Sequence, residues 1–465
     1  MLKNNVISSG IWFTISNFFV RSIGLVTTPI FTRMLTKAEF GSFNNFSTWT
    51  GIILVVVSLN LEASLIRAKF DFKDDLDNYV TSMILLSTLS TGIWYIIACI
   101  FRSSLSVFLS MDFKYISCMF VYLMFYPVIN IFQTMERFNY KYKLTVAISV
   151  SVSVSTSVLS VLLVYCMPDH LMGRTIGYVL PVAVVGGLLF IYCIIKKSRP
   201  DIKYWKYALP FTLPYIPHLL SMNLLSGMDR VMINRMCGLE ELALYSLAYT
   251  CGTLVSILVT SINSAYSPWL GQKLSEKNYS VIKQISVPYV GAFTYAAGGA
   301  ILIIPELLYI MGGPSYMEAK YVMPPVAASC VLQFIYCMYV NVEQYEKKTG
   351  RMALASVIAV IINYVLNTIC IPLYGYIAAA YTTYASYFVL MVLHILIVKN
   401  IGMSHVYNNK KIIFIAGISI CLALIANIIV GLLWIRYAIF LLYCLIGLVF
   451  IYKYRSNIIF FMRRK

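Results

Sequence analysis

The sequence contains few charged residues. Asp, Glu, Lys and Arg make up 12% of its 465 residues, whereas a soluble domain carries about 25%. Hydrophobic residues make up 60%, and the mean hydropathy is +0.80. A water-facing globule cannot bury so much apolar surface, and long apolar runs need a backbone satisfied within each segment. The short alternating segments of a β-barrel are absent, so we predict an all-α integral membrane protein.

Motifs for nucleotide, metal or redox chemistry are also missing. The sequence has no Walker A run, no HExxH pair and no CxxC pair, and its 4 His residues are far apart. The 11 Cys are scattered, mostly in apolar segments, which is typical of small buried hydrophobic residues. We therefore expect no cofactor and no enzymatic activity. Basic cytoplasmic loops explain the net charge of +18, so no nucleic-acid partner is expected.

Apolar runs of about 20 residues predict roughly 14 transmembrane helices. A basic break divides them, so we predict an N-terminal six-helix bundle at 1–195, a cytoplasmic linker at 196–206 and a C-terminal six-helix bundle at 207–398. Two additional helices and a basic tail follow at 399–465. The predicted spans are Val6–Phe31, Phe40–Ile66, Tyr79–Phe101, Ile116–Phe132, Leu144–Cys166, Leu171–Ile195, Tyr207–Arg235, Leu242–Tyr266, Ile285–Met311, Tyr321–Val342, Met352–Pro372, Tyr376–Val398, Ile412–Trp434 and Tyr437–Tyr452.

Lys and Arg are distributed unevenly between alternate loops. Most of the 36 fall in loops on the side of the N-terminus, and only a few, such as Arg33, Arg174 and Arg235, fall on the other side. Cytoplasmic loops are enriched in Lys and Arg. The pattern therefore predicts a multi-pass protein with both termini in the cytoplasm.

A weak internal repeat relates two segments 202 positions apart. It aligns Pro29–Asn44 with part of Met228–Tyr249, placing Arg33 on Arg235 and Glu39 on Glu241. Six predicted spans separate the copies, so both have the same orientation. The repeat predicts two similar halves related by an axis along the membrane normal, with a substrate path between them.

Each half carries one polar stripe with an arginine. The spacing i, i+4, i+7, i+11 puts the members of each stripe on one helical face. We predict that the stripes face a cavity that binds a phosphate or pyrophosphate. The alternative is that each arginine neutralises a neighbouring acid and only holds helices together. The stripes are Asn17, Arg21, Gly24 and Thr28 in the first span, and Asn223, Gly227, Arg230 and Asn234 in the seventh.

Three acidic residues are candidates for coupling transport to an ion. Asp229 lies on a different helical face from Arg230, so we expect it to pair with a residue of another helix. The alternative is a role in proton coupling. Glu62 lies near the inner end of the second span, where Arg67 or a headgroup lysine is an alternative partner, and Glu306 lies near the outer surface. Structural roles are the simpler interpretation of both. Arg33 and Arg235 close helices at the outer face, where they either extend toward water or contact substrate.

Three segments, taken in order, resemble the polysaccharide-exporter branch of the multidrug/oligosaccharidyl-lipid/polysaccharide exporter superfamily. Ile377 and Ala243 stand where the family pattern has glycine. The matching residues are Pro29, Arg33, Leu35, Glu39, Phe40 and Gly41 near the start, Asp229, Arg230, Gly238 and Tyr245 in the middle, and Asn363, Leu366, Asn367, Ile371, Pro372, Gly375, Ala378, Ala379, Ala380 and Thr383 in the third segment.

The resemblance implies a Wzx-type flippase in the bacterial inner membrane. Such proteins move undecaprenyl-pyrophosphate-linked oligosaccharide units, for O-antigen or a similar surface polysaccharide, by alternating access. It implies two six-helix bundles around a cationic cavity, an ion gradient as driving force, and a polymerase or chain-length regulator as partner. One alternative is a MATE-like exporter of cations or drugs, which would need carboxylates in its cavity. A membrane glycan polymerase is a further alternative, but it would need a long periplasmic loop.

Overall fold

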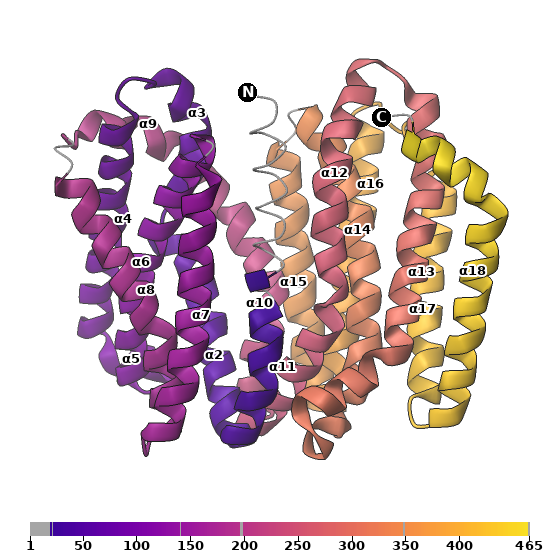
Figure 1. The fold of residues 1–465 in the computed structure, drawn as a ribbon, viewed down its shortest axis with the longest axis horizontal. Coiled ribbons are helices and arrows are strands. Elements are labelled where there is room, and N and C mark those ends of the chain that lie inside the picture. Colours follow the sequence, from indigo (N-terminus) through magenta and orange to yellow (C-terminus); the bar gives the residue numbers. More distant parts are fainter. Residues whose placement is uncertain (1–18, 21, 140, 196–198, 347–348, 464–465) are drawn as a thin grey trace. The chain divides into compact units, whose positions relative to one another are not determined.

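The computed structural model describes residues 19–20, 22–139, 141–195, 199–346 and 349–463. These residues are almost entirely helical and contain no strand (Figure 1). The elements up to the middle of the chain are α2 (Lys37–Val57), η1 (Leu61–Ser64), α3 (Leu65–Asp71), α4 (Leu76–Ile100), α5 (Arg102–Leu109), α6 (Phe113–Phe138), α7 (Tyr142–Cys166), α8 (His170–Ile195), α9 (Ile202–Thr212), η2 (Leu213–Tyr215), α10 (Ile216–Met236) and α11 (Leu239–Thr253). The remaining elements are α12 (Val255–Ser275), α13 (Tyr279–Gly312), η3 (Pro314–Val322), α14 (Met323–Tyr345), α15 (Thr349–Tyr374), α16 (Ala378–Asn400), α17 (Asn409–Ile429) and α18 (Leu433–Arg463).

The predicted all-α membrane fold is confirmed. Eleven helical segments in the described residues are long and apolar enough to cross a membrane, and α18 adds a shorter apolar segment, Leu433–Val449. The first predicted span lies largely outside the described residues. The seventh, Tyr207–Arg235, is divided into α9, η2 and α10, because Pro214 lies in the short helix η2 and Pro217 lies in the first turn of α10. The second span ends at Val57, earlier than predicted, and Glu62 lies beyond it on η1.

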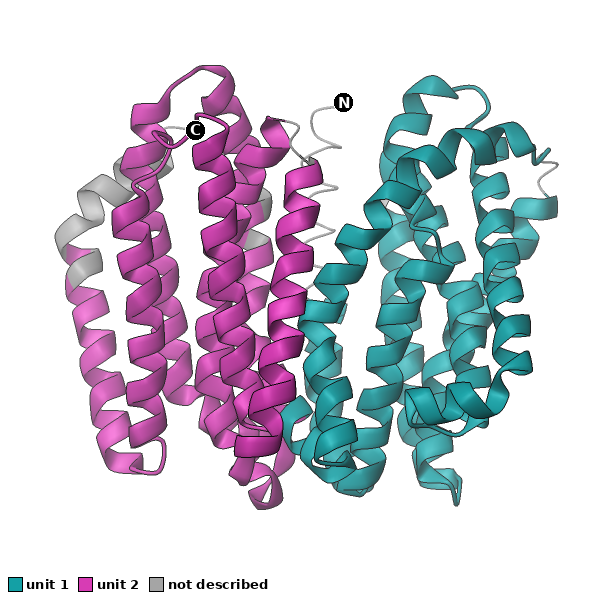
Figure 2. Ribbon diagram, turned by 180° about the vertical axis from the view of Figure 1, so that it is seen from behind, with its two compact units in different colours: residues 1–246 teal, residues 247–465 magenta. Residues whose placement is uncertain are grey.

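The chain divides into two compact units, residues 1–246 (unit 1) and 247–465 (unit 2) (Figure 2). The division falls within α11 and not at the basic segment 196–206. The reason is that α10 packs along α2 and therefore belongs to unit 1. The two helices are so close that a Cβ on Gly227 would lie 3.2 Å from the Cγ2 atom of Thr48. The domain limits inferred from the loops remain a prediction about the membrane topology.

Gly41 of α2 is required by a close approach of two helices. A Cβ at this position would lie 2.0 Å from the backbone oxygen of Leu239 at the start of α11. Position 41 corresponds to Ala243 in the repeat, and Ala243 lies at the same crossing, with its backbone nitrogen 3.4 Å from the same Cβ position. The two copies of the repeated segment therefore touch each other inside unit 1.

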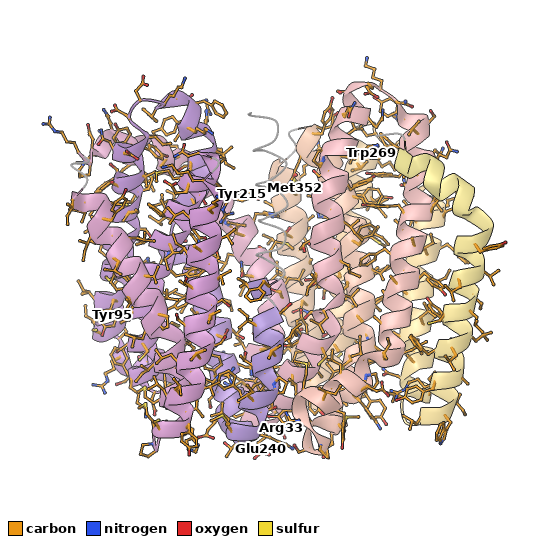
Figure 3. All side chains as sticks on the ribbon, in the orientation of Figure 1. Arg33, Tyr95, Tyr215, Glu240, Trp269 and Met352 are labelled. Carbon is orange, nitrogen blue, oxygen red and sulfur yellow. The ribbon has the colours of Figure 1, made fainter. Side chains whose placement is uncertain are left out.

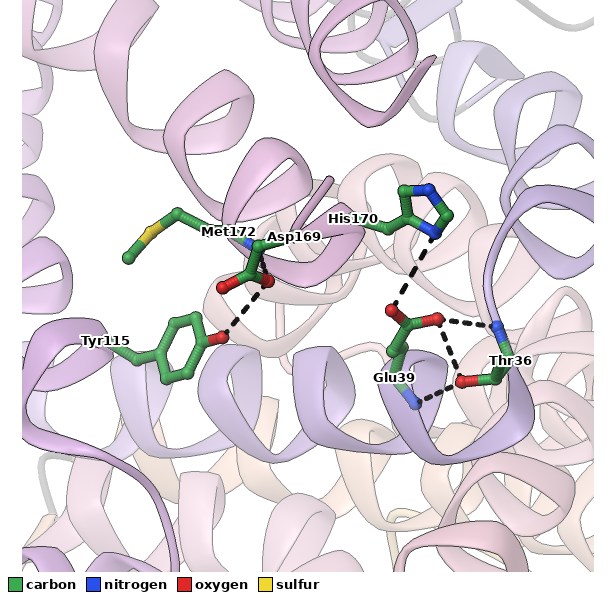
Figure 4. Close-up of polar contacts among 6 residues, drawn as sticks. All are labelled: Thr36, Glu39, Tyr115, Asp169, His170 and Met172. Carbon is green, nitrogen blue, oxygen red and sulfur yellow. Dashed lines mark hydrogen bonds and ion pairs between the residues drawn. The ribbon is translucent and has the colours of Figure 1, made fainter. Parts of the chain in front are cut away.

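The first turns of α2, α6 and α8 meet at one end of unit 1, the outer end in the predicted topology (Figure 4). Thr36 and Glu39 form a reciprocal capping box at the start of α2, and the Glu39 carboxylate lies 3.8 Å from the imidazole of His170 at the start of α8. The next residue back, Asp169, accepts bonds from the backbone N–H of Met172 at 2.9 Å and from the Tyr115 hydroxyl at 3.5 Å. These contacts fix the ends of three helices that surround a cavity.

In unit 2, α14 is central and packs against α12, α13, α16 and α17. The Glu343 carboxyl of α14 lies 2.8 Å from the Nδ1 atom of His394 of α16, and the two side chains are 0% and 2% exposed. The His394 ring lies 5.8 Å from the ring of Tyr336, centroid to centroid. A fully buried pair of this kind fixes the relative position of two central helices.

Helix α18 is held against α13 by two sets of contacts. The Tyr295 and Tyr443 rings stack at 4.1 Å, and each hydroxyl donates to the other residue's backbone carbonyl, that of Tyr443 at 2.7 Å. Gly298 and Gly447 provide room, since a Cβ there would lie 2.6 and 2.7 Å from these hydroxyls. Further along the two helices, Arg436 donates to the Glu306 carboxylate, which also accepts a bond from Tyr437 at 2.9 Å.

Candidate functional site

A polar cavity of about 540 Å³ lies inside unit 1. Its walls come from α6, α7, α8, the start of α2 and the helical residues 22–34. This volume is in the range of ligand-binding pockets, about 300–1,000 Å³. Two arginines line the cavity, Arg174 and Arg137, and no Asp or Glu is among the described residues around it. Its charge therefore suits an anion, and we call it the arginine cavity.

Arg174 is held in place by aromatic rings. Its guanidinium carbon lies 3.7 Å from the ring centroid of Phe31 and 4.0 Å from that of Phe43, and Phe40 is at 5.4 Å. Aromatic faces attract a guanidinium through the ring quadrupole. The donors of a guanidinium lie in its plane, in a fork that matches two oxygens of a phosphate. The stacking thus orients Arg174 before any ligand arrives.

A stripe of hydroxyl groups on α7 forms a second wall. Ser149, Ser153, Thr156 and Ser160 are spaced by four, three and four residues, which puts them on one helical face. The Nε2 atom of Gln133 on α6 donates to the Ser149 hydroxyl at 3.0 Å. At 1.5 Å per residue, the stripe extends for about 16 Å. Hydroxyls that both donate and accept suit the hydroxyl groups of a sugar.

Three stacked tyrosines form a third wall. The ring centroids of Tyr122 and Tyr178 are 5.0 Å apart with an interplanar angle of 13°, and those of Tyr122 and Tyr126 are 4.9 Å apart at 16°. Phe43 meets Tyr178 edge-on at 5.6 Å, so this stack continues to the rings that hold Arg174. Arg137 lies at the other end, in the last turn of α6. The cavity therefore has one arginine near each end and aromatic and hydroxyl groups between.

A smaller polar cavity of about 210 Å³ lies beside it. Glu62, Asn60, Asn223 and Asn130 are among its lining residues, and Asn130 also lines the arginine cavity. Burial raises the pKa of the Glu62 carboxyl above its usual 4.5, while Arg137 and a hydrogen bond from Asn130 act in the opposite direction. We call this the Glu62 cavity. Arg67, a predicted partner of Glu62, instead pairs with Asp71 at 3.5 Å.

A larger groove of about 870 Å³ has a different character. It lies between α4, α6 and α8, and exposed apolar side chains such as those of Leu89, Ile93 and Ile96 line it. Apolar side chains exposed on a membrane-spanning helix face lipid. Its lining includes the acidic residue Asp201 and no described Lys or Arg, so the groove lacks the positive charge that distinguishes the arginine cavity.

The predicted stripe in the first span is described only in part. Asn17 and Arg21 lie outside the described residues, but Gly24 and Thr28 line the arginine cavity. In the second stripe, Asn223 lines the Glu62 cavity and Gly227 faces α2. Arg230 and Asn234 are partly buried on α10 and are not part of the lining of either cavity. The substrate-binding role of both stripes stays a prediction.

Two predicted coupling residues have partners on other helices. Asp229 is 1% exposed and accepts a bond from the Tyr245 hydroxyl of α11 at 2.7 Å. Glu306 binds Arg436 of α18, as described above, and lines neither cavity. Both contacts join helices, as the structural interpretation expects, and the coupling role stays a prediction.

The arginines of the predicted outer face bind backbone carbonyls. Arg33 donates to the carbonyl of Pro29 at 2.7 Å, and Arg235 donates to that of Phe108. Figure 3 shows Arg33 at the same end of unit 1 as Glu240, where α10 ends and α11 begins. Neither Arg33 nor Arg235 lines the two polar cavities.

The residues of the third motif make contacts between helices of unit 2. Asn363 and Asn367 are buried in α15 and bonded to each other at 3.1 Å, and Thr382 of α16 donates to Asn367. Pro372 lies in the last turn of α15, and Gly375 ends the helix with φ +71°, a conformation that favours glycine. These contacts connect α15 to α16.

Sequence reasoning missed the two arginines and the α7 stripe. Loop assignment placed Arg174 at the outer surface and Arg137 in an inner loop, although both belong to helices. The stripe on α7 was hidden because Val residues alternate with the hydroxyl residues and keep the segment apolar. The signal that finds Arg137 and the stripe is helical spacing of polar residues within a span, here Asn130, Gln133 and Arg137 on α6 together with the four residues on α7.

Comparisons with known proteins agree with this architecture. The sequence model of the family described as "Polysaccharide biosynthesis protein" matches residues 6–273, and the MatE family model matches residues 214–369. Protein 1 of the lsg locus of Haemophilus influenzae is 25% identical over 348 residues, 72% of this chain and 83% of the relative. A protein of Haloferax volcanii named a probable low-salt glycan biosynthesis flippase, Agl15, is 25% identical over 203 residues, 43% of this chain and 42% of the relative.

Solved structures of transporters share the fold. The lipid II flippase MurJ in an inward closed conformation has a TM-score of 0.76 at 16% identity, over 96% of this chain and 100% of that chain. An inward-facing multidrug resistance MATE transporter has a TM-score of 0.67 at 15% identity, over 83% of this chain and 94% of that chain. The names that state an activity are those of flippases and transporters, and none is that of an enzyme. The sequence model of the polysaccharide biosynthesis protein family matches more than half of the residues. The chain therefore belongs to this family, within the multidrug/oligosaccharidyl-lipid/polysaccharide exporter superfamily that its motifs resemble.

Proposed function

We propose that the protein is a flippase for lipid-linked glycan precursors. The observation that carries the proposal is the arginine cavity, where two arginines lie among hydroxyl and aromatic groups and no carboxylate is found among the described lining residues. Family membership and the naming of one relative as a glycan biosynthesis flippase support the same class of substrate. The pyrophosphate of the precursor binds Arg174, since a guanidinium fork matches its oxygens.

The dimensions of the cavity favour the polar headgroup over the lipid. A cavity of about 540 Å³ accommodates a diphosphate with its first sugars, and its arginine, hydroxyl and amide side chains suit these polar groups better than a polyprenyl chain. The finer proposal is an undecaprenyl-pyrophosphate-linked oligosaccharide repeat unit of O-antigen or a similar surface polysaccharide. It moves across the bacterial inner membrane by alternating access, driven by an ion gradient, with both termini in the cytoplasm. A polymerase and a chain-length regulator are the proposed partners.

A MATE-like cation exporter is the second candidate. The MatE model matches residues 214–369, and MATE transporters share the fold. A cationic substrate would require carboxylates in the cavity, whereas the described lining of the arginine cavity carries two guanidinium groups. The charge of this cavity therefore favours the flippase. A glycan polymerase is disfavoured because the predicted outer loops are short.

The test is complementation of a strain that lacks its own flippase. Arg174→Ala and Arg137→Ala should reduce the surface glycan strongly at normal protein levels. Charged hydrogen bonds contribute about 1.5–3 kcal/mol each, equivalent to roughly a 10- to 150-fold loss of affinity. Arg67→Ala, which removes an exposed arginine paired within α3, is the matched control. Full glycan with both cavity variants, or drug efflux without any glycan transfer, would refute the proposal.

A further inference from the structure

The arginine cavity and the Glu62 cavity share one residue and lie on either side of it. Asn130 of α6 lines both. Arg137, two turns further along the same helix, lines the arginine cavity, and its charge also acts on the Glu62 carboxyl. Arg137 and the partly buried acid Glu62 are thus connected through seven residues of one helix.

The backbone near Glu62 departs from regular helix. Leu59 and Asn60 have φ values of 53° and 48°, in the left-handed region that non-glycine residues rarely adopt. This break ends α2 and allows η1 to carry Glu62 into the cavity beside Asn223. The Nδ2 atom of Asn60 is buried with no hydrogen-bond acceptor among the described residues. Such strain is retained at sites where the surrounding structure requires it.

The charge that acts most directly on Glu62 comes from α6. Arg137 acts on its carboxyl, and Glu62 in turn acts on the Tyr126 hydroxyl. Several ionisable groups of the other neighbouring elements have partners of their own. Arg67 of α3 pairs with Asp71, Lys69 of α3 donates to the Phe138 carbonyl, Tyr79 of α4 donates to Ser64, Tyr207 of α9 donates to Asp71, and the His218 ring of α10 lies 5.3 Å from the ring of Tyr215.

We infer that Glu62 is a proton-exchange site coupled to the arginine cavity through Arg137 and Asn130, so that binding of an anionic headgroup is accompanied by uptake of a proton. This inference rests on the proposed function. Without an anion, the Arg137 guanidinium stabilises the ionised Glu62 carboxylate. A bound diphosphate interacts with the same positive charge, so the partly buried Glu62 carboxylate loses the stabilising effect of Arg137 and binds a proton. The coupling is reciprocal, and protonation of Glu62 therefore strengthens anion binding.

A proton fits this site better than a metal cation. The Glu62 cavity offers oxygen atoms from a carboxylate, amides and the Ser58 hydroxyl, which are also ligands for metal ions. The positive charge of the Arg137 guanidinium, however, already acts on the carboxylate and would repel a metal cation. A proton neutralises the carboxylate without bringing further charge into the cavity.

Calorimetry of the full chain in lipid nanodiscs tests the inference. Inorganic pyrophosphate is titrated near neutral pH in two buffers with different enthalpies of protonation, which gives the number of protons taken up per anion. The pyrophosphate's own protonation contributes equally to all variants. Wild type should take up more protons than Glu62→Gln, and Glu62→Gln should bind pyrophosphate at least about 5-fold more tightly, the lower limit of typical coupling factors. The control Glu240→Gln removes an exposed carboxyl at the predicted outer end and should match wild type.

The experiment distinguishes a failure of the proposed function from a failure of the coupling alone. If wild type binds no pyrophosphate, the arginine cavity is not an anion site and the proposed function fails. If wild type and Glu62→Gln bind it with equal proton uptake, only the coupling fails. An affinity that follows Na⁺ concentration at constant pH would replace the proton by a metal ion. Should Glu62→Gln not fold, infrared difference spectra of wild type provide the answer, since the absence of a protonated-carboxyl band on pyrophosphate binding would overturn the inference.

Discussion

The Asp229 carboxylate of α10 accepts a hydrogen bond from the Tyr245 hydroxyl of α11 at 2.7 Å, and both side chains are buried. Asp229 is the acid of a family motif, and Tyr245 lies at the end of the same motif. The bond fixes the turn between two consecutive helices of unit 1, at the end where the repeated segments touch. It therefore explains the spacing of this motif in structural terms.

Replacement of Tyr245 by Phe should destabilise the protein. A hydrogen bond to a charged group contributes about 1.5–3 kcal/mol, and the substitution removes it without creating a large cavity. Thermal unfolding in detergent, followed by tryptophan fluorescence, measures the change. Tyr165→Phe is the control, because this tyrosine is 82% exposed. Equal unfolding curves for wild type and Tyr245→Phe would contradict the assigned role.

Gly41→Ala should disrupt the crossing of α2 and α11. The new Cβ would lie 2.0 Å from the Leu239 backbone oxygen, which belongs to a helix and cannot move alone. Overpacking typically costs about 1–3 kcal/mol. Gly51→Ala in the same helix is the matched control, since nothing lies within 4 Å of its Cβ position. There alanine should stabilise the helix by roughly 0.5–1 kcal/mol. Expression and melting temperatures of the two variants should thus change in opposite directions.

The pair Glu343–His394 should be sensitive to the loss of either partner. Glu343→Ala leaves a buried imidazole without its partner, and a buried polar group left unsatisfied costs about 1–3 kcal/mol. A double variant, Glu343→Leu with His394→Leu, should recover much of this loss because it leaves no unpaired polar group. Unfolding measurements on the single and double variants form a thermodynamic cycle. Additive effects would show that the two side chains do not interact.

The contact between Arg436 and Glu306 should hold α18 in place. Arg436 is 4% exposed and Glu306 is partly exposed, so Arg436→Gln should cost less than a fully buried pair, about 1–3 kcal/mol. A cysteine pair placed between α13 and α18 should then crosslink more slowly than in the native sequence. Arg455→Gln, beyond the apolar part of α18, serves as a comparison. Unchanged crosslinking in Arg436→Gln would exclude this role.

Stability should depend on pH through Glu62. Burial raises the pKa of its carboxyl in the folded state above the ordinary 4.5, so the folded protein binds this proton more strongly than the unfolded chain. The associated stability is fully present below about pH 4.5 and is lost as the pH rises through the folded-state pKa. Glu62→Gln should lack this part of the pH dependence and gain stability relative to wild type at neutral pH. A difference between the two proteins that does not change with pH would contradict the assignment.

Hydropathy made the membrane helices predictable because a bilayer imposes one length and one composition on each span. The ends of spans were less accurate. Glu62 was placed inside the second span, and the structure puts it on η1, because the left-handed residues Leu59 and Asn60 end α2 without any proline or glycine to announce the break.

The candidate site could be predicted from the sequence only where a single helix carries the lining residues. The spacing of Gly24 and Thr28 identified the face of the first helix that lines the arginine cavity. Arg174 could not be recognised from spacing alone, because Phe31 and Phe43, which hold it, are more than a hundred positions away in the sequence. The pairing of Glu343 with His394 likewise joins two helices that no local pattern connects.

The reciprocal bonds between Tyr295 and Tyr443 have a consequence for how the last helix can move. Each phenol donates to one carbonyl on the opposite helix and occupies the space left by one glycine. A displacement of α18 by a single turn would break both bonds and place each ring opposite a residue larger than glycine. These contacts therefore oppose sliding of α18 along α13 and favour movement of the two helices as one body.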